Sequence, residues 1–270
     1  MLGGIRAIAD AVASVFFPAP CEMCGDVLLS ASPLPICVKC RAALVPLRGP
    51  VCEHCGRPFP SETALEAVNP RCFACRQNLY GFDAARSYGA YSDEMVKAIT
   101  LLKYHRLTRL GGWFAEKLKA TAEANPIIRE ADALVPVPLH PARLRERRYN
   151  QTELIARPLA RLMRIPLDAR LLVRIKPRPP QLFLSRRERW LSVRGAYEIR
   201  DGRRIDNQRV LLIDDVFTTG ATLDACARVL KKAGAKSVVG LTVARALWRG
   251  SPPAERLRQI SSDRKGQNSI

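Results

Sequence analysis

The fold of this chain is decided by one stretch of its 270 residues, Val210-Leu211-Leu212-Ile213-Asp214-Asp215-Val216-Phe217-Thr218-Thr219-Gly220-Ala221-Thr222-Leu223. The first four residues are apolar, which predicts a buried parallel strand near residues 209–214. Two carboxylates follow where the strand is expected to emerge, and this is where open α/β sheets bind ligands. We expect the Thr-rich loop to open a helix over Leu223–Ala233, ended by Gly234.

The polar residues of this stretch have the chemistry of a sugar-phosphate site. Backbone N–H groups at a loop and helix start can hold a terminal phosphate together with hydroxyls, and the candidates are Thr218, Thr219, Gly220, Ala221 and Thr222. Asp214 and Asp215 repel phosphate, but they suit the two hydroxyls of a ribose or a Mg²⁺-bound sugar. A buried strand that ends in a solvated acidic turn is the alternative, and it does not explain Thr-Thr-Gly-x-Thr. The order of these residues therefore favours a 5-phosphoribosyl group.

The stretch resembles the phosphoribosyl pyrophosphate signature of type I phosphoribosyltransferases, in which four apolar and two acidic residues precede a Thr-rich loop. Every position of that pattern is matched. The resemblance implies an α/β fold with a parallel sheet and a reaction that passes through an oxocarbenium-like ribose. It also implies catalytic roles for Asp214 and Asp215 toward the ribose and Mg²⁺.

A second strand–loop–helix segment adds positive charge. Residues 133–138 predict a strand, a basic loop follows, and a helix is expected from Thr152. The loop contains Arg143, Arg145, Arg147 and Arg148, and Asn150 and Gln151 lie where the helix starts. In isolation, an exposed basic turn is the alternative. Beside a phosphate site, we expect Arg148, Asn150 and Gln151 to face pyrophosphate.

Repetition of the strand-then-helix pattern predicts one large domain at residues 84–250. We expect a parallel, twisted sheet with helices on both faces, with strands near residues 84–91, 133–138, 170–175, 209–214 and 236–243. Apolar residues recur at helical spacing within residues 1–18 and predict a short amphipathic helix that ends at Pro18. A signal peptide is disfavoured because Asp10 interrupts its apolar region. Residues 251–270 predict a frayed polar tail.

Eight of the nine cysteines form four Cys-x-x-Cys pairs within residues 19–82: Cys21/Cys24, Cys37/Cys40, Cys52/Cys55 and Cys72/Cys75. Two such pairs can complete a tetrahedral Zn²⁺ shell. We therefore expect two structural Cys₄ zinc ribbons that combine the first pair with the second and the third with the fourth, and an interleaved pairing stays open. Disulfides are disfavoured without a secretory signal, and a redox Cys-x-x-Cys is usually solitary. His54 is expected to be an exposed spacer inside a zinc knuckle.

The net charge of +19 is unevenly distributed along the chain. Residues 1–85 contain seven of the 44 Lys and Arg and seven of the 25 Asp and Glu, so the whole excess lies in residues 86–270. This asymmetry favours an anionic partner, either phosphate groups or nucleic acid, and an Arg-rich solvated surface is the alternative. The basic segment 176–197 predicts a flap over the substrate or a track for single-stranded DNA, with Trp190 either stacking on bases or anchoring the segment.

The order of these parts resembles the ComF family of competence-associated proteins over nearly the whole chain. The matching motifs are the two cysteine ribbons, Tyr88-Gly-Ala-Tyr91, Leu101-Leu-Lys-Tyr104, Arg148-Tyr-Asn-Gln151 and Asp-Asp-Val-x-Thr-Thr-Gly-x-Thr. Pro179 and Ser192 stand where the family pattern has Thr and Asn, which affects acceptor or DNA recognition rather than phosphate binding. The resemblance implies a phosphoribosyltransferase-like domain with an N-terminal zinc module. It also implies a role in handling incoming single-stranded DNA, with a DNA-uptake helicase as partner.

Two functions are therefore expected. The first is phosphoribosyl transfer from phosphoribosyl pyrophosphate, with Mg²⁺, to an unknown acceptor. The second is a non-catalytic sensor or single-stranded DNA-binding protein that keeps the fold, which the charge and Trp190 favour. No uninterrupted apolar run approaches the roughly 20 residues that cross a bilayer, so we expect a cytoplasmic protein with no membrane partner.

Overall fold

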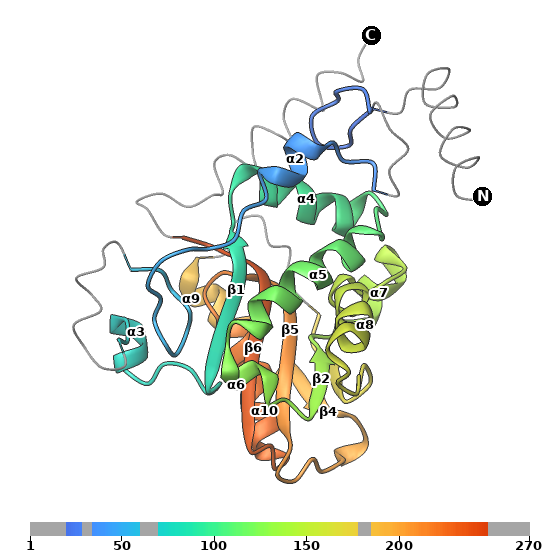
Figure 1. Cartoon of the computed structure of the whole chain (residues 1–270). Coiled ribbons are helices and arrows are strands. Elements are labelled where there is room, and N and C mark those ends of the chain that lie inside the picture. The colour runs from blue at the N-terminus through green and yellow to red at the C-terminus, as the bar shows by residue number, and fades with distance from the viewer. Residues whose placement is uncertain (1–19, 29–33, 60–69, 178–184, 248–270) are drawn as a thin grey trace.

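The computed structural model describes residues 20–28, 34–59, 70–177 and 185–247. The predictions for the N-terminal helix and for the polar tail lie outside these ranges. A four-stranded parallel sheet with strand order β1-β6-β5-β2 forms the centre of the structure (Figure 1). Its strands are β1 (Ala84–Ala90), β2 (Ala133–Pro136), β5 (Arg209–Phe217) and β6 (Ser237–Arg245). The predicted parallel sheet is confirmed, and β5 continues past its predicted end at residue 214.

Helices connect the strands and follow the predicted alternation. Between β1 and β2 lie α4 (Asp93–Tyr104), α5 (Leu110–Glu123) and α6 (Pro126–Arg129), and β2 is followed by α7 (Pro141–Arg147) and α8 (Gln151–Met163). Further along the chain, α9 (Arg186–Leu191) precedes β5, and α10 (Ala221–Lys232) joins β5 to β6. The cysteine-rich region contributes the short helices α2 (Val38–Ala42) and α3 (Phe73–Arg76). Among the described residues, no helix is both long and apolar enough to span a bilayer.

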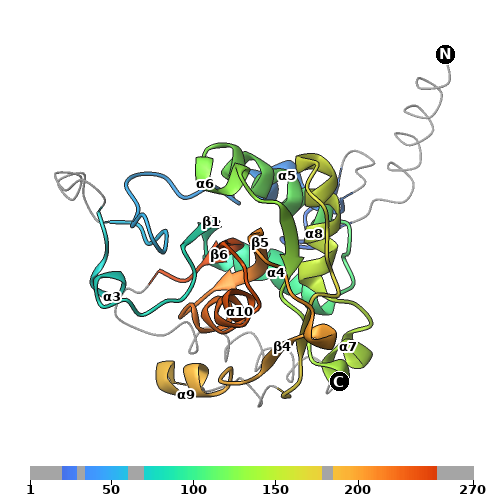
Figure 2. The same ribbon diagram turned by 90° about the horizontal axis from the view of Figure 1, so that it is seen from below.

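Helices cover both faces of the sheet because β5 is apolar on both sides. Leu211 and Ile213 pack into one cluster with residues of α4, α5 and α8, whereas Val210 and Leu212 pack into another with residues of α10. Successive side chains of a strand point to opposite faces, so a continuous apolar run is buried on both. Figure 2 shows α5 and α8 on one side of the sheet and α10 on the other.

The predicted strand at residues 170–175 does not join the main sheet, so this part of the prediction is wrong. Leu172–Arg174 (β3) pairs antiparallel with Tyr197–Ile199 (β4) in a separate two-stranded sheet. Tyr197 is buried in the apolar cluster that contains α10, and Arg174 donates a hydrogen bond to the Tyr197 hydroxyl at 2.7 Å. The physical reason is that α10 has apolar surface on the side away from the main sheet, and the small sheet buries it.

The segment around the third cysteine pair docks directly on β1. The amide of Ala85 donates to the carbonyl of His54 at 2.7 Å, and a Cβ on Gly56 would lie 2.5 Å from the Ala85 carbonyl oxygen. Gly56 also has a φ of +71°, so both the close approach and the backbone conformation require glycine. His54 is half-buried, with Nε2 2.7 Å from the Phe82 carbonyl oxygen. The expectation of an exposed His54 is wrong because the knuckle packs against the sheet.

Candidate functional site

Asp214 and Asp215 lie inside β5 rather than beyond its end. The pairing of β5 with β6 extends to Phe217, and the two carboxylates are largely buried, with exposed fractions of 8% and 6%. Asp214 Oδ1 accepts a hydrogen bond from the Asp215 amide at 2.9 Å. Adjacent buried carboxylates repel each other, and they need donors or cations nearby to stay ionised.

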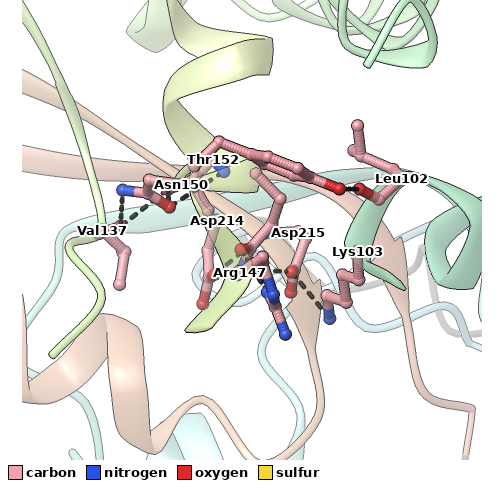
Figure 3. Close-up of polar contacts among 10 residues, drawn as sticks. Leu102, Lys103, Val137, Arg147, Asn150, Thr152, Asp214 and Asp215 are labelled. Carbon is pink, nitrogen blue, oxygen red and sulfur yellow. Dashed lines mark hydrogen bonds and ion pairs between the residues drawn. The ribbon is translucent and has the colours of Figure 1, made fainter. Parts of the chain in front are cut away.

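A buried ion pair holds Asp215. Lys103 Nζ lies 2.7 Å from Asp215 Oδ2, and the same oxygen accepts from Gln151 Nε2 at 2.9 Å. Gln151 Oε1 in turn accepts from Arg147, so a lysine, an amide and a guanidinium gather around one carboxylate (Figure 3). Burial is the largest single influence on Lys103 and lowers its pKa, but the charge and hydrogen bond of Asp215, together with Tyr91 and Tyr104, raise that pKa above its ordinary value. Lys103 therefore stays cationic.

The last turn of α4 brings Lys103 to this place. Tyr149 donates its hydroxyl to the Leu102 carbonyl at 2.6 Å, which joins the end of α4 to the loop between α7 and α8 (Figure 3). The guanidinium of Arg147 lies over the Tyr104 ring, 4.8 Å from its centroid. Lys103 was not predicted as a site residue and was noted only as part of the motif Leu101-Leu-Lys-Tyr104. The available signal was a lysine directly after two apolar residues at the end of an amphipathic helix.

The three residues predicted to face pyrophosphate, Arg148, Asn150 and Gln151, have different surroundings in the structure. Arg148 ends α7 with a φ of +72° and is exposed, and Gln151 lies beside the acid pair. Asn150 caps α8, because its Oδ1 accepts from the Thr152 amide at 3.2 Å and its Nδ2 donates to the Val137 carbonyl at 3.0 Å. Asn150 is only 8% exposed. Its amide is therefore engaged in holding the start of α8, and the expected contact of Asn150 with pyrophosphate does not fit this geometry.

The Thr-rich loop opens α10 as predicted for the strand–loop–helix unit. Gly220 is the N-cap of α10 and has a φ of +82°, while Thr219 is buried and Thr218 and Thr222 are half-buried. The Ala221 amide donates to Thr219 Oγ1 at 3.4 Å. Within the described ranges, the amides of Thr219, Gly220 and Thr222 donate to no protein acceptor. Donors of this kind at a helix N-terminus can hold an anion.

Aromatic side chains support the loop. Tyr80 donates its hydroxyl to the Thr219 carbonyl at 3.0 Å, and its ring stacks on Phe82 with 4.7 Å between the centroids. Phe217, at the end of β5, meets Tyr80 edge-on at 6.0 Å. Trp190 of α9 stacks on Tyr80 at 6.0 Å. This contact favours the alternative in which Trp190 anchors its segment to the protein, because one face of its ring packs against Tyr80.

Arg245 connects these aromatic residues to the second half of the cysteine-rich region. Its guanidinium lies over the Phe217 ring at 3.9 Å from the centroid, and Nη1 donates to the Cys55 carbonyl at 2.6 Å. Nη2 lies 3.4 Å from Cys55 Sγ. Arg245 is only 2% exposed, and a buried cation needs nearby partners of opposite charge. The support of the Thr-rich loop therefore depends on the surroundings of Cys55.

The paired cysteines form two compact groups in the sequential arrangement: Cys21, Cys24, Cys37 and Cys40 in cluster 1, and Cys52, Cys55, Cys72 and Cys75 in cluster 2. Within each cluster the four sulfur atoms lie within 4.8 Å of one another. The Cys24–Cys37 and Cys55–Cys72 sulfur distances are both 3.7 Å. Tetrahedral Zn–S bonds of about 2.3 Å separate the sulfurs by about 3.8 Å. Both donor sets therefore fit Zn²⁺.

The two clusters differ in their surroundings. All four cysteines of cluster 2 are buried, whereas in cluster 1 Cys24 is exposed and Cys37 and Cys40 are half-buried. Burial raises the pKa of the Cys21 thiol, but hydrogen bonds from backbone amides, that of Cys37 first, lower it to about 6. A lowered thiol pKa favours the thiolate that binds metal. Cluster 2 is thus part of the protein core, and cluster 1 lies nearer the surface.

Comparison with known proteins agrees with this arrangement. The sequence matches the family described as "Double zinc ribbon domain" over residues 12–76 and the family described as "Phosphoribosyl transferase domain" over residues 153–267. It is 30% identical to "Competence protein ComFC" of Bacillus subtilis over 215 residues, which are 78% of this chain and 84% of that protein. This chain belongs to the ComF family.

Further relatives of this ComF-family protein have similar names. "Competence protein F" of Haemophilus influenzae is 27% identical over 73% of this chain and 85% of its own length. "DNA utilization protein YhgH" of Salmonella typhimurium is 27% identical over 82% and 94%. Among solved structures, a purine phosphoribosyltransferase from Pyrococcus horikoshii aligns with a TM-score of 0.31 and 18% identity over 52% of this chain and 92% of that chain.

Proposed function

We propose that this protein binds phosphoribosyl pyrophosphate together with Mg²⁺ at the carboxyl end of β5. One observation carries the proposal: the buried acid pair and the unpaired amides at the start of α10 belong to one short, continuous segment. Carboxylates suit a ribose and its metal ion, and helix-start amides suit a phosphate. A sugar phosphate is a ligand that can use both at once.

The proposed roles follow the predicted ones, with one change. Asp214 and Asp215 hold the ribose hydroxyls and Mg²⁺, and the loop from Thr218 to Thr222 holds the 5-phosphate. Arg148 and Gln151 lie on the pyrophosphate side, and Arg147 joins them because it is bonded to Gln151. Asn150 is left out because it caps α8.

Phosphoribosyl transfer to an acceptor is the reaction that such binding serves. When bound, Mg²⁺ neutralises charge on the departing pyrophosphate. The carboxylates of Asp214 and Asp215 favour the positive charge that develops on the ribose, and the loop fixes the sugar by its phosphate. The names of the relatives point to DNA uptake or utilisation, so we propose that this chemistry acts in natural transformation. A helicase partner stays a prediction from the family resemblance.

Binding measured by calorimetry tests the proposal. Wild-type protein should bind phosphoribosyl pyrophosphate only with Mg²⁺, and Asp215→Asn should weaken binding by about tenfold or more, because an amide is a poor ligand for Mg²⁺. Asp206→Asn is the control, since Asp206 is an exposed carboxylate that precedes the opposite end of β5 and pairs with Arg204. Equal affinity of wild type and both variants would contradict the proposed site. Pyrophosphate release with bases, nucleotides or DNA then tests catalysis.

A basic surface on α8 favours a second candidate function, the binding of single-stranded DNA. Arg157, Arg161 and Arg164 are exposed and line a shallow hollow with residues 165–167. Arg157 and Arg161 are four residues apart on one face of α8, and Arg164 directly follows the helix with a φ of +57°. Arg157 pairs with Glu153, whereas Arg161 and Arg164 extend the positive surface toward the end of α8. A line of guanidinium groups suits successive phosphates of a nucleic-acid backbone.

Salt dependence of oligonucleotide binding tests this second function. The double variant Arg161→Gln/Arg164→Gln should weaken binding and reduce the slope of log affinity against log salt by about one to two, because up to two phosphate contacts are lost. Arg203→Gln/Arg204→Gln is the matched control, because it removes the same charge from arginines that pair with Asp168 and Asp206. The same slope for wild type and both variants would exclude this surface as the DNA contact.

A further inference from the structure

The ammonium group of Lys103 lies beside the acid pair, where a divalent ion bound to Asp215 would also lie. Its Nζ lies 2.7 Å from Asp215 Oδ2 and approaches the carboxylate from α4 (Figure 3). Gln151, at the start of α8, donates to the same oxygen. An ammonium group and a divalent ion repel each other strongly when both contact one carboxylate in a buried site. A Mg²⁺ ion held by Asp215 would therefore have to displace Lys103.

The position of Lys103 allows such a displacement. The residue lies in the last turn of α4, and its side chain keeps 19% of its surface exposed. Its ammonium is a compact charge on a flexible stem, which suits contact with phosphate oxygens. Arg147 also lies close to Asp215 (Figure 3). It is bonded to Gln151, and its guanidinium lies over the ring of Tyr104, the neighbour of Lys103. Two cationic side chains, Lys103 and Arg147, therefore lie near Asp215, and a polyanion bound there could contact both.

We propose that Lys103 is a mobile cation that pairs with Asp215 in the free protein and moves to the pyrophosphate when the ligand and its divalent ion bind. This inference rests on the proposed function and names a further ligand-binding residue for it. The divalent ion takes over the neutralisation of Asp215, and the pyrophosphate gives Lys103 a new partner. A divalent ion alone binds weakly, because it must leave the lysine without a partner. The ion and phosphoribosyl pyrophosphate therefore bind cooperatively.

Two titrations on the full-length protein test the exchange. Mn²⁺ alone, followed by electron paramagnetic resonance, should bind Lys103→Met about tenfold more tightly than wild type, since the competing cation is gone. Phosphoribosyl pyrophosphate with Mg²⁺, followed by calorimetry, should bind the same variant about tenfold more weakly, since a phosphate contact is lost. Lys97→Met, an exposed lysine on the same helix, should change neither affinity.

The opposite signs of the two effects identify the mechanism. A lysine with a purely structural role would weaken both affinities when replaced, and this result, or no change in either, would overturn the inference. Because Lys103→Met removes an ammonium group from beside a buried carboxylate, Lys103→Gln provides a second variant that can still donate a hydrogen bond to Asp215. The same opposite signs are expected for it.

A crystal structure of the wild type with phosphoribosyl pyrophosphate and Mg²⁺ decides the question without a variant. Lys103 Nζ should lie within about 3.2 Å of a phosphate oxygen and no longer contact Asp215; an intact ion pair would overturn the inference. A wild type that binds no phosphoribosyl pyrophosphate would overturn the proposed function. In that case, tighter Mn²⁺ binding by Lys103→Met would still support displacement of the lysine, and unchanged Mn²⁺ binding would refute it.

Discussion

Serine in place of Cys75 is expected to destabilise the phosphoribosyltransferase-like domain strongly, whereas serine in place of Cys24 is expected to destabilise it only slightly. Cys75 belongs to cluster 2, in which all four cysteines are buried. Loss of the metal from cluster 2 would disturb Cys55, whose carbonyl accepts a hydrogen bond from Arg245. Arg245 lies over the ring of Phe217, so the packing of Phe217 near the Thr-rich loop would loosen as well. Structural zinc contributes about 10 kcal/mol or more of apparent binding free energy in small domains. Even a fraction of this is large against ordinary protein stability.

Zinc content and thermal unfolding distinguish the two variants. Each should lose about one zinc per chain, because each lacks one ligand of one Cys₄ site. For Cys75→Ser we expect a fall in Tm of about 10 °C or more, which corresponds to a destabilisation of at least about 3 kcal/mol in a domain of this size. Cys24→Ser, in the more exposed cluster 1, should lower Tm by only a few degrees. Similar falls in both variants would show that the two clusters contribute equally to the core.

Alanine in place of Gly220 is expected to weaken strongly the anion site proposed for the Thr-rich loop. Gly220 has a φ of +82°, and a Cβ there would lie 2.6 Å from Tyr80 Cε1 and 2.7 Å from Phe217 Cζ. The left-handed conformation costs alanine about 1–2 kcal/mol, and overpacking of the rings adds about 1–3 kcal/mol. The strain can be relieved by moving the loop, which would turn its amides away from a phosphate.

The variant Gly49→Ala separates the cost of the left-handed backbone conformation from the cost of overpacking the aromatic rings. Gly49 has a similar φ of +87°, but a Cβ there meets nothing within 4 Å. The free energy of unfolding of this control should fall only by the cost of the left-handed conformation for alanine, and its affinity for phosphoribosyl pyrophosphate should not change. For Gly220→Ala we expect the free energy of unfolding to fall by about 2–4 kcal/mol and the affinity to fall by about a hundredfold. Equal stability losses in the two variants would refute the role assigned to the ring contacts.

The parts of the structure that were predicted correctly are those with local sequence signals. The run from Val210 to Ile213 and the residues that follow it contain a strand, a loop and a helix start within one stretch, so the parallel sheet could be inferred. The cysteine spacing likewise predicted two compact groups. The partner of Leu172–Arg174 could not be inferred, because an apolar segment carries the same pattern whether it joins a parallel sheet or covers the outside of a helix.

Two features of the site were beyond local reasoning for different reasons. Lys103 reaches Asp215 only because Tyr149 fixes the end of α4 against the next loop, and no short motif encodes a contact between such distant segments. Asn150 was expected to bind pyrophosphate because it precedes a helix beside a basic loop. The same residue type is favoured as a helix N-cap, and the sequence alone does not separate the two roles.

The docking of the His54–Gly56 turn on β1 has a consequence for experiments that divide the protein. A boundary near residue 82 separates the cysteine-rich region from the sheet in the sequence, but the backbone of Ala85 is bonded across it. Tyr80 and Phe82 also lie against Phe217. A truncated fragment that starts at residue 84 would leave these surfaces uncovered. Genetic complementation with such a fragment would then report damage to the Thr-rich loop as well as the loss of the cysteine-rich region.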